Sequence, residues 1–105
     1  MPSLTAKKLS EIIQLTPDIK LIDVREEDEY LFCKINGAKN IPISQIKKLI
    51  NTSQPNESIY LYCHRGLRAK LATQHMHQIG FNNVYYLEGG IEKWSLDIDK
   101  KVLRY

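Results

Sequence analysis

The chain has 105 residues, a length that suits one domain over residues 1–105. Hydrophobic residues make up 43% and charged residues 26%, the balance of an ordinary soluble globular protein. The formal charge is +3 and the lysines are scattered, so we expect no nucleic-acid-binding stripe and only a weak preference for anionic ligands or acidic partners.

In the first half of the chain, helical and extended patterns alternate. The expected elements are a helix from Thr5, its N-cap, to about Leu15, a strand at 20–24, a loop and short helix at 25–32, and a brief strand at 38–43 that Pro42 ends. Asn36-Gly37 indicates a turn before that last strand.

The second half continues the alternation. The expected elements are a helix at 45–50 capped by Ser44, a strand at 59–63, a helix at 67–79 ended by Gly80, a strand at 83–87, and a last helix at 91–98 after Gly89-Gly90. Such alternation predicts an α/β fold with a parallel sheet and helices on both of its faces.

Helix 67–79 is expected to turn an apolar stripe toward the sheet. The predicted inward residues are Leu71, Ala72, Met76 and Ile79. His75 lies on this inward stripe, four residues after Leu71, and is interpreted as a buried, hydrogen-bonded histidine rather than a metal ligand, since no histidine or cysteine spacing here matches a metal site. Trp94 is expected to pack in the core.

Three polar segments follow predicted strands. They are Asp23-Val24-Arg25, the loop 63–68 and Glu88-Gly89-Gly90. In a parallel sheet the carboxyl ends of the strands share one edge, where sites form. We therefore expect all three segments at one rim of the sheet.

The loop Cys63-His64-Arg65-Gly66-Leu67-Arg68 joins the strongest strand to a helix. Backbone N–H groups at a helix start, together with the helix dipole, favour an anion, and Gly66 lets the backbone curl. Arg65 and Arg68 add positive charge, so a thiolate at Cys63 is favoured over a thiol. This pattern indicates a nucleophilic cysteine acting on an anionic substrate, whereas a merely buried cysteine would leave both arginines and Gly66 unexplained.

Four segments together resemble a family. They are LIDVREEDEY at 21–30, INGAKNIPI at 35–43, CHRGLR at 63–68 and VYYLEGGIEKW at 84–94. With these segments the chain resembles a single-domain rhodanese, a sulfurtransferase. Two departures occur: Cys33-Lys34 stand where the family often has Gly-His, and Ala69 stands where serine often follows the loop arginine.

The resemblance implies a rhodanese-like fold with a five-stranded parallel sheet. It also implies that Cys63 takes the outer sulfur of a donor such as thiosulfate, carries it as a persulfide, and passes it to a thiophilic acceptor such as cyanide or a thiol. Loop amides from His64 to Leu67 and the guanidinium of Arg68 would hold the donor, with no metal or organic cofactor. The last residues also resemble rhodanese domains fused to enzymes that hand sulfur to carrier proteins, which makes a sulfur-carrier protein a candidate acceptor.

Two other functions are weighed against this one. Phosphatases on a related fold have five residues between the cysteine and the arginine, whereas four separate Cys63 from Arg68, a ring that suits a sulfane sulfur better than a phosphate. A non-catalytic rhodanese-like module docking an acidic partner is the other alternative. Such modules often lack the cysteine, so its presence favours catalysis.

Several residues at the predicted rim have two possible roles. Asp23 and Arg25 are expected to form an ion pair that supports the rim, with catalysis as the alternative. His64 either positions the loop or acts as a base, and a preformed thiolate needs no base. Arg65 either touches substrate or is solvated.

Cys33 is either inert or a resolving thiol for Cys63. Neither cysteine belongs to a CxxC pair, and two thiols do not make a disulfide framework. The N-terminal segment lacks the apolar region of a signal peptide, and no apolar run approaches the length of a membrane span. These features predict a cytoplasmic protein without membrane contact, where a free thiol can persist.

Overall fold

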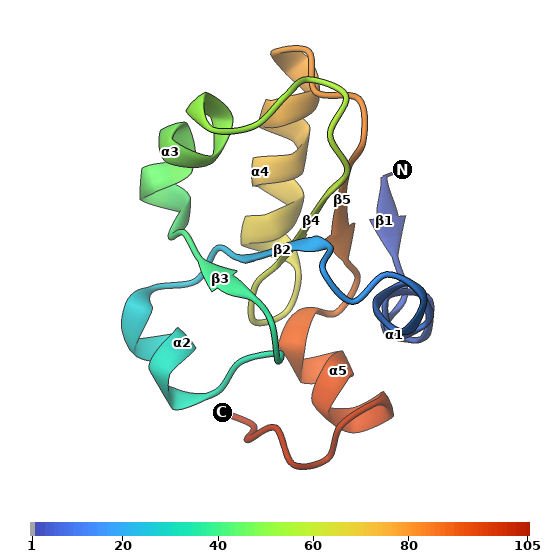
Figure 1. The fold of residues 1–105 in the computed structure, drawn as a ribbon. Helices are drawn as coiled ribbons and strands as arrows, with labels where there is room; N and C mark the ends of the chain where they lie inside the picture. The colour runs from blue at the N-terminus through green and yellow to red at the C-terminus, as the bar shows by residue number, and fades with distance from the viewer. Residues whose placement is uncertain (1) are drawn as a thin grey trace.

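The computed structural model describes residues 2–105, in which strands and helices alternate (Figure 1). The strands are β1 (Ser3–Leu4), β2 (Lys20–Asp23), β3 (Lys39–Asn40), β4 (Ile59–Tyr62) and β5 (Val84–Leu87). The helices are α1 (Ala6–Leu15), α2 (Glu27–Phe32), η1 (Ile43–Gln45, a 3-10 turn), α3 (Ile46–Asn51), α4 (Leu67–Gln78) and α5 (Gly90–Asp97). Within the described range, no helix combines the length and apolar character that a membrane crossing requires.

The five strands form one parallel sheet in the order β1-β5-β4-β2-β3. β4 lies at its centre between β5 and β2, which fits the absence of charged residues from this strand. The α/β fold with a five-stranded parallel sheet is thereby confirmed. All the strands place their carboxyl ends at one edge of the sheet.

A hydrophobic cluster lies on each face of the sheet. α3 and α4 cover one face, where Leu49 and Met76 pack on Ile22 and Leu61. α1 and α5 cover the other, where the packing residues are Leu9, Leu21, Tyr62 and Trp94. Neighbouring strand residues enter different clusters because side chains alternate across a strand. Helices on both faces of the sheet are confirmed (Figure 1). Trp94 is buried, which confirms its predicted core position.

Helix α4 buries Ala72 and Met76 as predicted, but not Leu71 and Ile79. Leu71 is 52% exposed and Ile79 is 49% exposed, while the buried residues of this helix are Ala69, Ala72, Thr73 and Met76. The small residues let the helix backbone approach the sheet and Cys63 closely, which larger side chains would prevent. His75 is exposed as well, so its predicted burial is wrong.

The ends of other elements also differ from prediction. Thr5 caps α1 as expected, accepting a hydrogen bond from the Lys8 backbone nitrogen at 3.1 Å. Ser44 does not cap α3, because it lies inside η1 and Gln45 takes the cap position. β3 is only two residues long, and β1, equally short, was not predicted because two residues carry no alternation pattern.

Candidate active site

Cys63 follows β4 directly and precedes the first turn of α4. Its Sγ accepts hydrogen bonds from the backbone nitrogens of Gly66 at 3.1 Å and Ala69 at 3.4 Å, and the residue is 1% exposed. Backbone donors at a helix N-terminus favour a negatively charged sulfur. Both of these donors to the sulfur are backbone amides, one from the loop and one from the first turn of α4.

The predicted conformational role of Gly66 is present. This residue is the N-cap of α4 and has φ +113°, in the left-handed region that favours glycine. A Cβ there would lie 3.4 Å from the Gly89 nitrogen and 3.6 Å from the Leu87 oxygen. The loop thus curls tightly against the end of β5.

The start of α5 holds the loop from another side. The backbone nitrogens of Ile91 and Glu92 donate to the carbonyl oxygens of Cys63 and His64, at 2.9 and 3.1 Å. A Cβ on Gly90 would clash with the same two oxygens, so only glycine fits. The loop and the segment that begins at Glu88 therefore meet at the carboxyl edge of the sheet, as the order of the elements predicts.

Asp23 and Arg25, from the rim segment that follows β2, form a fully buried ion pair. Arg25 Nη2 donates to Asp23 Oδ2 at 2.6 Å, and its Nε donates to Oδ1 at 3.0 Å. Arg25 also donates to the Cys33 carbonyl oxygen and, at 2.7 Å, to the Tyr105 hydroxyl. Burial lowers the pKa of Arg25, but its hydrogen bonds to Asp23 and Tyr105 outweigh burial and raise it. This geometry fits the structural interpretation of the pair.

Arg68 is paired with a residue that the sequence pattern did not single out. Its two terminal nitrogens donate to the two carboxylate oxygens of Glu29, at 2.6 and 3.0 Å. The hydrogen bond from Arg68 is the main cause that lowers the pKa of Glu29 to about 2. The Tyr105 hydroxyl also donates to this carboxylate, at 2.7 Å.

His64 packs under the last residue of the chain. Its ring stacks on the Tyr105 ring with centroids 3.8 Å apart and 9° between the planes. Its Nε2 is buried without a hydrogen-bond partner among the described residues. Burial, and then the charge of Arg65, lower the pKa of His64, which leaves the ring neutral at pH 7. A stacked neutral ring fits the positioning interpretation, while Arg65 and Leu67 are exposed.

Glu29 and Tyr105 are the site residues that sequence reasoning missed. Glu29 stands in an acidic run on the short helix α2, where it looks like a solvated charge. Tyr105 reaches the loop only because the chain turns back after α5, and its end lies beside α2 (Figure 1). No local pattern at either residue signals this contact.

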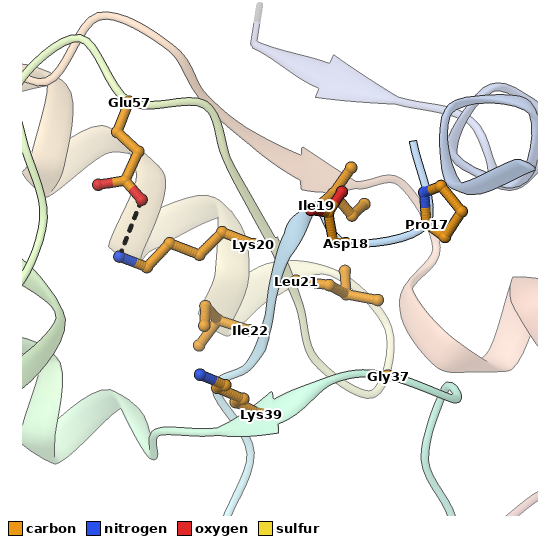
Figure 2. A pocket seen from close by; sticks show the side chains of 9 residues that line it. All are labelled: Pro17, Asp18, Ile19, Lys20, Leu21, Ile22, Gly37, Lys39 and Glu57. Carbon is orange, nitrogen blue, oxygen red and sulfur yellow. Dashed lines mark hydrogen bonds and ion pairs between the residues drawn. The ribbon is translucent and has the colours of Figure 1, made fainter. Parts of the chain in front are cut away.

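A hollow of about 490 Å³ lies elsewhere, at the amino ends of β2 and β3. Figure 2 shows Lys20 reaching across it to Glu57, an ion pair of 3.1 Å, with Lys39 near its rim. Its lining is Pro17, Asp18, Ile19, Lys20, Leu21, Ile22, Gly37, Lys39 and Glu57, so none of the predicted site residues contributes. The predicted site residues lie at the opposite edge of the sheet.

Comparison with known proteins identifies a family. The family model of the rhodanese-like domain matches residues 5–97. Among solved structures, SSP1007 from Staphylococcus saprophyticus is similar with a TM-score of 0.83 and 30% identity, over 99% of this chain and all of that one.

Three named relatives are similar to this chain in sequence. The "Uncharacterized protein YqhL" of Bacillus subtilis is 40% identical over 78% of this chain and 65% of its own length. The "Putative sulfur carrier protein YrkF" of the same organism is 28% identical over 90% of this chain and 51% of its own. The thiosulfate sulfurtransferase GlpE of Coxiella burnetii is 30% identical over 74% of this chain and 73% of its own. The chain thus spans about half to two-thirds of the length of the first two relatives.

Proposed function

This chain belongs to the family of rhodanese-like domains, and we propose that it is a sulfurtransferase that carries sulfur as a persulfide on Cys63. The observation that carries the proposal is the placement of Cys63 Sγ at the start of α4, with the amides of Gly66 and Ala69 donating to it. That environment suits both a thiolate nucleophile and the persulfide anion that replaces it.

The proposed first step balances without an oxidant. The Cys63 thiolate attacks the outer sulfur of thiosulfate, a new S–S bond forms, and the S–S bond of the donor breaks. The bonding pair leaves on sulfite. The total charge is unchanged, because the thiolate and the thiosulfate dianion give the persulfide anion and the sulfite dianion. No proton is moved, and a neutral His64 is therefore not required as a base.

In the second step a thiophilic acceptor attacks the outer sulfur of the persulfide. Cyanide serves as the acceptor in an assay, and a small thiol or a sulfur-carrier protein would serve in a cell. The relative named as a sulfur carrier supports a carrier protein as a partner of this chain. We also propose a cytoplasmic location, because a reducing compartment keeps the thiol free between turnovers.

The alternative is a non-catalytic module that docks an acidic partner through the loop. The close approach of Gly66 and Gly90 around Cys63 argues against it, because docking by charge does not require a sulfur enclosed by backbone donors. A relative named as a thiosulfate sulfurtransferase also supports catalysis.

The test is the intact mass of the protein after incubation with thiosulfate, beside the variant Cys63→Ser. We expect a gain of one sulfur atom in the native protein, reversed by cyanide, and no gain in the variant. The variant Cys33→Ser is the matched control and should load like the native protein. Equal gains with and without Cys63 would overturn transfer through this residue, and no gain from thiosulfate or from a thiol persulfide would favour the docking module.

A further inference from the structure

The cationic side chain best placed to hold an anionic donor already has an anionic partner. Arg68 forms two hydrogen bonds with the carboxylate of Glu29, and Glu29 keeps only 19% of its side chain exposed. A sulfonate that binds to Arg68 must therefore take the place of Glu29 or share the guanidinium with it. Like charges brought together at one cation repel each other.

Tyr105 holds Glu29 in this arrangement. Its hydroxyl donates to Glu29 Oε2 and accepts from Arg25 Nη1, both at 2.7 Å. Its ring stacks on His64 and meets the Phe32 ring edge-on at 5.8 Å. Tyr105 thus ties the carboxylate to the rim and covers the residue next to the nucleophile.

The segment before Tyr105 is fastened at two further points. The Ser95 hydroxyl donates to the Val102 carbonyl oxygen at 2.6 Å, and Arg104 donates to Glu92 at 2.7 Å. Both partners belong to α5, whose first turn holds the loop of Cys63. The position of Tyr105 over His64 therefore follows from the packing of α5.

Both groups keep their protonation states at neutral pH. The hydrogen bond from Arg68 lowers the pKa of Glu29 to about 2, so its carboxylate is charged. Burial is the main cause that raises the pKa of Tyr105 to about 12, so its hydroxyl stays a donor. A full negative charge thus stands beside Arg68 throughout the working range.

Resting on the proposed function, we propose that Glu29 and Tyr105 are specificity-determining residues that disfavour donors bearing a multiply charged anionic group. Thiosulfate must compete with Glu29 for Arg68, whereas an uncharged alkyl persulfide need not. With the protonated form of that donor, the Cys63 thiolate forms a bond to the outer sulfur, the donor S–S bond breaks, and the bonding pair leaves on the alkyl sulfur. The proton passes to that sulfur, so the products are the Cys63 persulfide anion and an alkyl thiol. Two effects combine. The negative charge of Glu29 disfavours anionic donors at Arg68, and the Tyr105 ring, stacked on His64, restricts access to the loop of Cys63.

The test uses two alkylating reagents of similar size and different charge. We measure second-order rate constants for alkylation of the Cys63 peptide by iodoacetate and by iodoacetamide. Glu29→Gln should raise the iodoacetate-to-iodoacetamide ratio about tenfold, because the negative charge paired with Arg68 is removed and the guanidinium becomes free for the anionic reagent. Tyr105→Ala should instead raise both rate constants, since loss of the ring that stacks on His64 opens access to the loop of Cys63 for either reagent.

Matched controls are available toward the amino ends of the strands, away from the loop of Cys63. Glu57→Gln removes a carboxylate paired with Lys20, and Tyr85→Phe removes the hydroxyl of a tyrosine stacked on Tyr60. Both should leave the ratio at its native value. Tyr105→Phe keeps the ring and every carboxylate, and it should raise the ratio by about twofold, because Glu29 is then held by one hydrogen bond fewer and yields Arg68 more readily to the anionic reagent.

Sulfur transfer supplies a second readout. Glu29→Gln should lower the thiosulfate KM and leave kcat unchanged, since the carboxylate competes equally with the bound donor and with the transition state. An unchanged alkylation ratio in both Glu29→Gln and Tyr105→Phe, with folding verified by thermal unfolding, would overturn the specificity role. Alkylation needs no sulfur transfer, so this result is separate from failure of the proposed function.

Discussion

Backbone groups rather than side chains place the sulfur of Cys63. Its two donors are the amides of Gly66 and Ala69, and the Ala69 side chain is fully buried against the sheet. Any residue except proline supplies such an amide, so alanine in place of the serine often found there keeps the donor. What position 69 requires is a small side chain, and alanine meets this requirement.

At the same scale, the ion pair of Glu29 predicts how stability depends on pH. Its pKa is about 2 in the folded protein against about 4.3 when unfolded, so its contribution is complete above about pH 4.5 and is lost as the pH falls toward 2. We expect Glu29→Gln to cost about 1–2 kcal/mol at pH 7, after allowance for solvent screening of Arg68, whose side chain is 34% exposed. Urea unfolding at pH 7 and pH 3 measures this, and the cost should shrink by more than half at the lower pH.

Glu57→Gln is the control for that measurement. The pKa of Glu57 is also lowered, first by the Gln54 backbone nitrogen and then by Lys20, but this carboxylate is more exposed. Its substitution should therefore cost less at pH 7. A cost for Glu29→Gln that is the same at both pH values would contradict the ion-pair account.

At the scale of elements, the sequence predicts the alternation of strands and helices and the rim that they share. Periodicity and turn residues suffice for this, because β4 is uncharged and Gly66, Gly80 and Gly90 mark the element ends. The buried face of α4 was predicted only in part, at Ala72 and Met76. Large apolar residues predict burial by hydrophobicity, but Leu71 and Ile79 are exposed, and close approach of α4 to Cys63 selects the small residue Ala69.

The contact between α5 and the loop also belongs to this scale, and Gly90 tests it. A Cβ at this residue would clash with the Cys63 and His64 carbonyl oxygens, and its φ is +59°. We expect Gly90→Ala to cost about 3 kcal/mol, from backbone strain plus displacement of the loop. Urea unfolding gives the cost, and the extent of persulfide formation reports whether the loop has moved.

Gly37→Ala is the matched control for Gly90→Ala. Gly37 has φ +88°, but nothing lies within 4 Å of an added Cβ. Only the backbone conformation is then strained, so the expected cost is about 1 kcal/mol and sulfur loading should stay native. Equal losses of stability and equal sulfur loading in the two variants would contradict this account. They would mean that Gly90 is not required by the contact between α5 and the loop.

At the scale of the whole molecule, Arg25 joins parts of the chain that are far apart in sequence. Its guanidinium contacts Asp23 at the end of β2, the Cys33 carbonyl oxygen after α2, and Tyr105 near the chain end. The pairing of Asp23 with Arg25 was predictable from their order in the sequence. Their contact with Tyr105 was not, because it depends on how α5 and the following residues pack.

This central position predicts a large effect of Arg25→Met on stability. The substitution leaves Asp23 buried without its cation, and we expect a loss of about 3–5 kcal/mol in urea unfolding. Adding Asp23→Asn should recover part of it, because an amide oxygen can still accept from the Arg25 backbone nitrogen, at 2.9 Å in the native protein. Lys20→Met breaks the part-exposed pair with Glu57 and should cost below about 1 kcal/mol. A cost for Arg25→Met as small as that would mean that this ion pair does not hold the rim together.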